Sequence, residues 1–462
     1  MPALAGIHPV SPFPGRMRRR QACARAPLFF AKPQEAFMST ADLGIQSPTA
    51  HLFNPLFAHP EGSPIRELFP YLSRPGMLSL AGGYPSPSLF DAEGLQQAAM
   101  AALQQDAAAS LQYGASEGQL PLREALAALC ATRGIACTPA DMIVTTGSQQ
   151  AFDLLVKVLV EPGDPVLVEV PAYPATLQTL KLAQAQVVAV PTDEQGLDTE
   201  ALARLLAQWP HARAPKLLYT VPNFSNPGGT LLPAARRTAL VALAREHGFV
   251  IVEDDPYGEL RFTGQREPSI YETGLALCGA QANPVVYLSS LSKTVAPALR
   301  IGWMLADAQL LRRCTIAKQT ADLCTSPLAQ MIAAHYLRSG RYAPQLAQAC
   351  AEYAARMDAL CSGMQSALGE QIRFVRPAGG MFVWAQLLPP QRHAGEPEAL
   401  ARALFTAAVE QGVLYVPGKA FFPAEAAQQA GLCMRLSYAA PTVPQITEAV
   451  ARLGRAWGQA VS

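Results

Sequence analysis

The hydrophobic positions of the chain change their spacing from region to region. From Asp91 to about residue 335, short apolar runs rich in β-branched or aromatic residues alternate with stretches in which Leu and Ala recur at helical spacing. Apolar strands that alternate with helices are typical of a mostly parallel sheet covered on both faces. Seven runs predict strands, at residues 142–147, 165–170, 186–190, 216–221, 249–254, 285–290 and 301–306. The pattern therefore predicts an α/β fold, with a mostly parallel seven-stranded sheet in a large domain at 91–335.

The regions on either side of this domain have different patterns. At 336–462, a long helical stretch leads to FVRPAGGMFVWAQL, a second Ala-rich helix and MRLSYA, which predicts a smaller α+β domain. Residues 45–90 mix a short helical piece, Ile65–Leu72, with Pro- and Gly-rich turns. Because the central sheet is complete without them, we expect residues 45–90 to pack against the small domain.

The first 44 residues show no pattern of a folded element. Residues 1–37 contain five arginines and no acid before Glu35. An arginine-rich, acid-poor leader is typical of an organelle transit peptide, whereas Met38 opens an alternative start, MSTADLG. We expect residues 1–44 to be a disordered leader or the product of a misassigned start.

Composition narrows the choice of partner and compartment. The chain has 462 residues, of which 50% are hydrophobic and 15% charged, and its net charge is +1. This balance argues against nucleic acid or an anionic membrane as the main partner, and no apolar run reaches the ~18 residues of a membrane span. The nine cysteines are dispersed, without a CxxC pair. They predict reduced thiols in a soluble, cytoplasmic protein and no zinc or other metal site.

Polar residues stand at the ends of several predicted strands, where parallel sheets bind their ligands. After MIVTT, the residues Gly147-Ser148-Gln149 open a helix, which is an ordinary N-cap or an anion site. After KLLYTVP comes NFSNPGG, from Asn223 to Gly229, which a simple turn would also explain.

The next two strands end in charged residues. FVIVE runs into Asp254 and Asp255, which belong to a solvent-facing strand end or need a cationic partner if they are buried. VVYLSS runs into SSLSKTVAPALRIGW, which places Lys293 among serines and Arg300 seven residues later. Lys293 is a surface lysine or one that performs covalent chemistry.

In this order on successive strands, these elements resemble the fold-type I enzymes that use pyridoxal 5′-phosphate, specifically the class I/II aminotransferases. Among these, the chain looks most similar to the 2-aminoadipate and kynurenine aminotransferases. The resemblance runs from about Ser63 to Arg455, and the elements SxSK…R, DDPY and SNPGG carry it. The usual NPTG of the family reads NPGG here, with its asparagine kept.

The resemblance implies a role for each cofactor-binding residue. Lys293 would hold the cofactor as a Schiff base and move the substrate proton, which requires an amine with a lowered pKa. Asp254 would pair with the pyridine nitrogen, and Tyr257 would hydrogen-bond the ring oxygen, which makes these three the catalytic residues. The other cofactor contacts would be Asn226 on the ring oxygen, Tyr173 on the ring face, and Ser148, the Gln149 N–H, Ser290, Arg300 and a neighbouring subunit's Tyr113 on the phosphate.

Substrate contacts follow from the same resemblance. Arg435 in MRLSYA would bind the α-carboxylate, with Asn226 and Asn223 beside it. Gly82 and Gly83 would let the backbone line the pocket, and Tyr84 would add to its wall. Arg66 either meets a distal carboxylate or is a solvated helix residue.

These roles predict an aminotransferase that passes the amino group of an L-amino acid to a 2-oxo acid by ping-pong kinetics. Because Tyr113 would act across subunits, a homodimer is expected. Elimination or decarboxylation on the same cofactor is the alternative, since fold does not fix function. Some transcription regulators carry this domain behind a DNA-binding module. The residues before Ser63 are Pro-rich and lack the amphipathic helix pairs of such a module, so we do not expect a regulator.

Overall fold

The computed structural model describes residues 49–57, 62–391 and 395–462, so the expectation of a leader at 1–44 lies outside the described residues. The chain divides into two compact units, Met1–Ala58 and His59–Ser462. In the first unit, the described residues form two short 3-10 turns, Ala50–Leu52 and Pro55–Phe57. All the other helices and strands of the described residues lie in the second unit.

A large sheet forms the centre of the second unit, with strand order β2-β9-β8-β7-β6-β3-β4-β5. All seven predicted strands are present in it, and the two-residue β5 adds an eighth at the edge, as the antiparallel partner of β4. The strands are β2 (Met142–Thr146), β3 (Pro165–Val170), β4 (Gln186–Asp193), β5 (Gly196–Leu197), β6 (Leu217–Thr220), β7 (Val250–Asp255), β8 (Val285–Ser290) and β9 (Ile301–Leu305).

Strand direction decides which residues meet at the edge of this sheet. The neighbours from β4 through β3, β6 and β7 to β8 pair in parallel, so their carboxyl ends lie at one edge. Strand β9 runs antiparallel to both β8 and β2, so its amino-terminal end lies at that same edge. Arg300, the residue before β9, is thereby brought to the end of β8 and the loop that holds Lys293.

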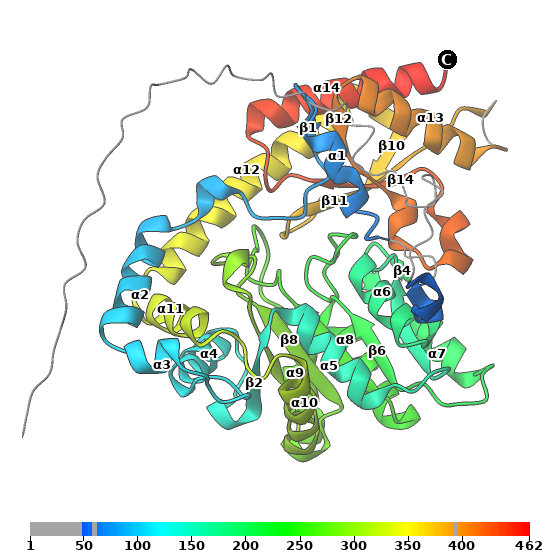
Figure 1. The fold of residues 1–462 in the computed structure, drawn as a ribbon. Helices are drawn as coiled ribbons and strands as arrows, with labels where there is room; N and C mark the ends of the chain where they lie inside the picture. The colour runs from blue at the N-terminus through cyan, green and yellow to red at the C-terminus, as the bar shows by residue number, and fades with distance from the viewer. Residues whose placement is uncertain (1–48, 58–61, 392–394) are drawn as a thin grey trace, which may run out of the picture. The chain divides into compact units, whose positions relative to one another are not determined.

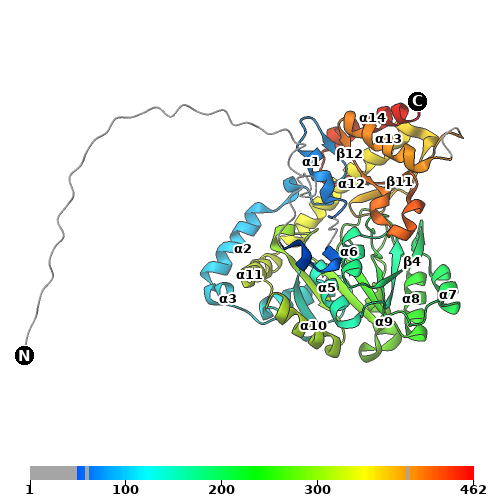
Figure 2. The same ribbon diagram turned by 45° about the vertical axis from the view of Figure 1, so that its right-hand side comes forward.

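Helices cover both faces of the large sheet, as Figures 1 and 2 show, and form two apolar cores with it. Helices α5, α6 and α10 pack on one face, and α4, α7, α8, α9 and α11 on the other. No helix in the described part of the chain is long and apolar enough to cross a membrane. The helices up to residue 338 are α1 (Phe69–Leu72), α2 (Ala92–Gln104), α3 (Ala107–Leu111), α4 (Leu120–Thr132), α5 (Ser148–Leu159), α6 (Pro174–Leu182), α7 (Thr199–Ala207), α8 (Ala234–His247), α9 (Ile270–Cys278), α10 (Ala308–Ala321) and α11 (Pro327–Arg338).

A second, antiparallel sheet follows, with strand order β10-β11-β14-β13. Helices α12, α13 and α14 share an apolar core with it. Strand β1 (Leu78–Ser79), from the N-terminal segment, pairs in parallel with β12 (Val413–Leu414), and α13 and α14 lie beside β12 (Figure 2). The remaining elements are α12 (Tyr342–Leu368), β10 (Ile372–Phe374), β11 (Phe382–Leu387), α13 (Pro397–Glu410), β13 (Val416–Pro417), β14 (Cys433–Ser437) and α14 (Val443–Ala460).

Gly302 on β9 lets two backbone segments approach closely at the sheet edge. A Cβ at this position would lie 2.5 Å from the carbonyl carbon of Gly147 and 2.7 Å from the backbone nitrogen of Ser148. Both contacts are with backbone, which cannot rotate away as a side chain would. The start of α5 and strand β9 therefore fit together only with glycine at 302.

We predict that Gly302→Ala lowers the free energy of unfolding by about 1–3 kcal/mol, as overpacking does. Gly458→Ala is the matched control, because nothing lies within 4 Å of a Cβ added at that position of α14. In a helix, alanine at 458 should add about 0.5–1 kcal/mol. Urea unfolding measures both variants, and equal stabilities would contradict the proposed close approach.

Candidate active site

A cavity of about 490 Å³ lies at the edge of the large sheet where the parallel strands end. Its walls come from the loops after β2, β3, β6, β7 and β8, from the N-terminal segment and from β14. The structure brings most of the predicted cofactor and substrate residues to this cavity. They are Arg66, Gly83, Ser148, Gln149, Tyr173, Asn226, Asp254, Tyr257, Ser290, Lys293, Arg300 and Arg435.

One end of the cavity is built to hold an anion. Helix α5 begins at Ser148, after Gly147 with φ +79°, and presents unpaired backbone N–H groups and the positive end of its dipole. The Arg300 guanidinium lies over Gly147: its Nη2 donates to the Thr146 carbonyl at 3.2 Å and would be 2.7 Å from a Cβ on Gly147. Arg300 itself has φ +55°, a conformation uncommon outside glycine.

Ser290 adds a hydroxyl to this anion site. The side chain is buried, and its Oγ lies 2.7 Å from the Ser292 hydroxyl and 3.0 Å from the Ile301 carbonyl oxygen. The Ser292 N–H donates to the same Oγ at 3.0 Å. A helix N-terminus, a guanidinium and serine hydroxyls together suit a phosphate.

Asp254 is buried at the floor of the cavity, with its two carboxylate oxygens in different surroundings. Oδ2 accepts a hydrogen bond of 2.7 Å from the Tyr219 hydroxyl. Oδ1 is also buried and accepts no hydrogen bond from a described residue. Burial raises the pKa of Asp254 to about 6, although the Tyr219 hydrogen bond lowers it. An unpaired carboxylate oxygen of this kind fits the N–H of a protonated pyridine ring.

Lys293 lies in the same cavity with a weakened positive charge. Its Nζ donates to the Gly83 carbonyl at 3.1 Å. Burial and the positive charges of Arg435 and Arg300 together lower the pKa of the amine to about 8, against the opposing effect of Asp254. A substantial fraction of Lys293 is therefore neutral near physiological pH, as a nucleophile or a base must be.

Arg435 is a buried cation without an acidic partner in the described part of the chain. Only 1% of its surface is exposed, and its guanidinium stacks over Phe382, with 4.4 Å between Cζ and the ring centroid. Nη1 donates to Asn226 Oδ1 at 2.9 Å and Nη2 to the Ala81 carbonyl at 2.7 Å, whereas Nε has no partner. Burial lowers its pKa to about 10. Such a group fits a ligand carboxylate.

The remaining predicted residues form the cavity walls. Tyr257 is buried with its ring edge-on to Phe382, and burial raises the pKa of its hydroxyl, against a lowering hydrogen bond from Asn226. Burial likewise raises the pKa of Tyr173, which lines the cavity beside α6. Arg66 reaches the cavity from the exposed surface.

The backbone at Gly83 lines the cavity, and Gly82 lies against the ring of Tyr84. A Cβ on Gly82 would lie 2.8 Å from the Tyr84 ring, and one on Gly83 would lie 3.6 Å from Arg435 Nη2. Tyr84 is itself a wall residue, and burial raises the pKa of its hydroxyl.

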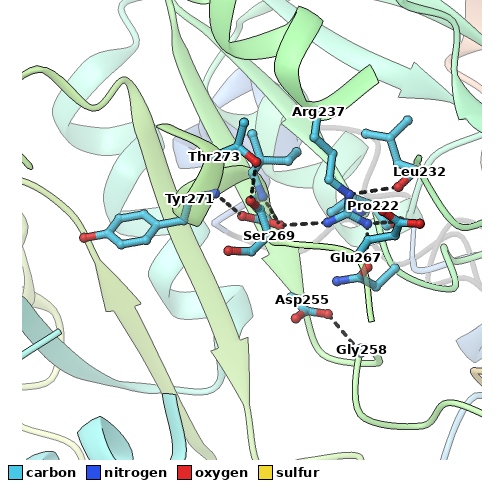
Figure 3. Close-up of polar contacts among 12 residues, drawn as sticks. Pro222, Leu232, Arg237, Asp255, Gly258, Glu267, Ser269, Tyr271 and Thr273 are labelled. Carbon is cyan, nitrogen blue, oxygen red and sulfur yellow. Dashed lines mark hydrogen bonds and ion pairs between the residues drawn. The ribbon is translucent and has the colours of Figure 1, made fainter. Parts of the chain in front are cut away.

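Two expected residues lie elsewhere. Asn223 is turned away from the cavity, because its Oδ1 accepts a hydrogen bond of 2.7 Å from Nη2 of Arg237. The expected contact between Asn223 and the substrate carboxylate is therefore wrong. Figure 3 shows the buried Arg237 bound also to the carbonyls of Pro222 and Leu232. Tyr113 does not line this chain's cavity, and 79% of its surface is exposed.

Asp255, the neighbour of Asp254, faces away from the cavity. Its Oδ1 accepts from the Gly258 N–H at 2.9 Å (Figure 3), and its Oδ2 accepts from the Tyr287 hydroxyl at 3.1 Å. The Gly258 contact closes the turn after β7, and the Tyr287 contact ties Asp255 to the neighbouring strand β8. The neighbouring Asp254 is thereby left as the carboxylate on the cavity side.

Sequence reasoning missed Tyr219, which lines the cavity and holds Asp254. The available signal was the one aromatic residue in the predicted strand KLLYTV, since a buried tyrosine hydroxyl needs a polar partner.

Comparisons with known proteins identify the family of this chain. Residues 86–453 match the family model described as aminotransferase class I and II. The chain is 36% identical over 396 residues to an aromatic-amino-acid aminotransferase of Thermococcus litoralis, covering 85% of this chain and 91% of the relative. It is 38% identical over 398 residues to a 2-aminoadipate transaminase of Thermus thermophilus, covering 86% and 94%.

Among solved structures, the fold is similar to a kynurenine aminotransferase of Pyrococcus horikoshii, with a TM-score of 0.82. The two are 34% identical, and the match covers 90% of this chain and 99% of the other. The chain therefore belongs to the aminotransferase class I and II family and is an aminotransferase of the type I fold.

Proposed function

We propose that this enzyme moves the amino group of an L-amino acid to a 2-oxo acid at the cavity around Lys293. One observation carries the proposal: Arg435, a buried cation without an acidic partner in the described structure, faces the same cavity as the lowered-pKa amine of Lys293. A substrate carboxylate on Arg435 would hold the substrate's Cα near that amine.

Pyridoxal 5′-phosphate is the cofactor, and when bound it supplies an electron sink for the substrate's Cα. The residues fit it. Ser148, the Gln149 N–H, Ser290 and Arg300 would hold the phosphate, Tyr173 would cover the ring, and Asn226 and Tyr257 would contact its oxygen. Asp254 Oδ1 would accept the ring N–H, and Lys293 would attach the cofactor covalently.

The proton steps would then fall to Lys293. As a neutral amine, Lys293 would remove the proton from the substrate's Cα and deliver it to C4′ of the cofactor. Arg435 would orient the substrate by a two-pronged hydrogen bond to the α-carboxylate, which a lysine could not reproduce. The two half-reactions share one site, so we propose ping-pong kinetics.

For the donor, we propose 2-aminoadipate, an aromatic or a branched-chain amino acid, with 2-oxoglutarate as the acceptor. The names of the relatives support the first two classes. Arg66 at the cavity edge would meet the distal carboxylate of an acidic substrate, whereas the rings of Tyr84 and Phe69 would contact an apolar one.

We also propose a homodimer whose active sites include the neighbouring subunit's Tyr113. Large apolar side chains are exposed on α2, α3 and the loop that follows, which is typical of an interaction surface. They are Met100, Leu103, Leu111 and Tyr113. A cytoplasmic location is our proposal as well, supported by the free thiols of the described cysteines.

Lys293→Ala tests the proposed chemistry. We expect it to abolish covalent attachment of the cofactor and to lower turnover at least about a thousandfold, because both the anchor and the base are lost. The measurement uses a panel of amino acids as donors with 2-oxoglutarate as the acceptor. It compares the amount of glutamate formed with the amount of donor amino acid consumed.

Lys157→Ala, which removes a lysine from a surface pair with Asp153, is the control and should leave turnover unchanged. Normal transamination by Lys293→Ala would refute the mechanism. Release of ammonia or CO₂ in place of a stoichiometric 2-oxo acid would favour elimination or decarboxylation.

Complementation tests the shared active site. We expect Tyr113→Ala and Lys293→Ala to be weakly active or inactive alone. After they are mixed through dissociation and reassociation, mixed dimers would hold one site with both native residues, so activity should rise to about a quarter of the wild-type value for random pairing, an estimate that rests on two-fold symmetry. No recovery, with mixed dimers demonstrated, would place Tyr113 outside the partner's site.

A further inference from the structure

Tyr219 on β6 makes a contact with the site that the proposed function does not use. Its side chain is 2% exposed, lines the cavity and donates its hydroxyl to Asp254 Oδ2 at 2.7 Å. Strands β6 and β7 pair in parallel, with Tyr219 opposite Val252, so the hydroxyl reaches along β7 to the carboxylate two residues later.

Tyr219 is itself held firmly. Its ring packs edge-on against Phe152 of α5, with 4.8 Å between centroids. Burial keeps the pKa of its hydroxyl well above the ordinary value. A hydrogen bond with the Thr176 side chain lowers this pKa, but by less than burial raises it. Tyr219 therefore stays a neutral donor with a fixed direction.

Resting on the proposed function, we propose that Tyr219 is a positioning residue: it fixes Asp254 through Oδ2 and leaves Oδ1 to accept the N–H of the cofactor's pyridine ring. The unpartnered, buried Oδ1 is the second half of this arrangement. A carboxylate held at one oxygen is restricted in the directions in which it can present the other.

The hydrogen bond also affects where the shared proton sits. Burial makes Asp254 more basic, and Tyr219 is the foremost group that opposes this. The other groups facing Asp254 act in both directions. Asp255 on β7 raises its pKa, whereas Ser148 of α5 and Lys293 after β8 lower it. Tyr173 and Tyr257 also face it, as neutral hydroxyls whose pKa values its charge raises. Without Tyr219, the proton between ring nitrogen and carboxylate should move toward Asp254.

The test is Tyr219→Phe, reconstituted with cofactor labelled with ¹⁵N in the ring. In the wild type we expect the ring nitrogen resonance at the position of a protonated pyridine near neutral pH. In Tyr219→Phe it should shift toward the unprotonated position, and kcat should fall about tenfold to a hundredfold, the range for loss of a hydrogen bond to a charged group.

Tyr287→Phe is the matched control. Tyr287 is also a buried strand tyrosine whose hydroxyl donates to a neighbouring aspartate, Asp255, but it does not line the cavity. Its loss should leave the ring nitrogen resonance unchanged. Thr176→Val removes the hydrogen bond on the Tyr219 hydroxyl and so only weakens Tyr219 as a donor. It should shift the ring nitrogen resonance in the same direction as Tyr219→Phe, but by less. Thr176→Val replaces Tyr219→Phe as the test if the latter does not fold.

The outcomes are distinct. A resonance at the wild-type position in Tyr219→Phe, or in Thr176→Val where Tyr219→Phe does not fold, would overturn the role of Tyr219 while leaving the proposed function in place. A wild type that binds the cofactor without protonating its ring nitrogen would overturn the Asp254 assignment and the Tyr219 proposal together. A wild type without covalently bound cofactor would overturn the proposed function itself.

Discussion

The site depends on charges that the fold buries without giving them full partners in the described structure. Asp254 Oδ1 and Arg435 Nε are buried polar atoms that make no hydrogen bond there. Each such atom costs about 1–3 kcal/mol of stability. The rest of the structure holds these groups in place at that cost, which a cofactor nitrogen and a substrate carboxylate would remove on binding. The cavity is in this sense preorganised for its ligands.

Topology brings these charges together from distant parts of the sequence. Parallel pairing puts Asp254 and the loop of Lys293 at one sheet edge, and the antiparallel direction of β9 adds Arg300. Arg435 comes from β14 of the other sheet and is held through the Ala81 carbonyl and Asn226. The lowered pKa of Lys293 is a product of this convergence, since two of its three charged neighbours are arginines.

Much of this could be predicted from the sequence, because strand periodicity and motif order are local signals. The seven apolar runs became strands, and SSLSK and DDPY led to Lys293 and Asp254. What failed depends on packing between elements. Asn223 turns to Arg237 because α8 buries a guanidinium beside that turn, and the Tyr219 contact requires the register of β6 on β7. The two-residue β5 is too short to leave a periodic pattern.

The central claim is that burial and two arginines make Lys293 a reactive amine, and the pH dependence of its reaction tests this directly. The measurement is the rate at which apoenzyme covalently captures pyridoxal phosphate, with Lys293→Ala as the blank. Only the neutral amine reacts, so the account predicts a rate that rises with pH and levels off above a midpoint at about 8. A midpoint near 10.4, the value of an unperturbed lysine, would contradict it.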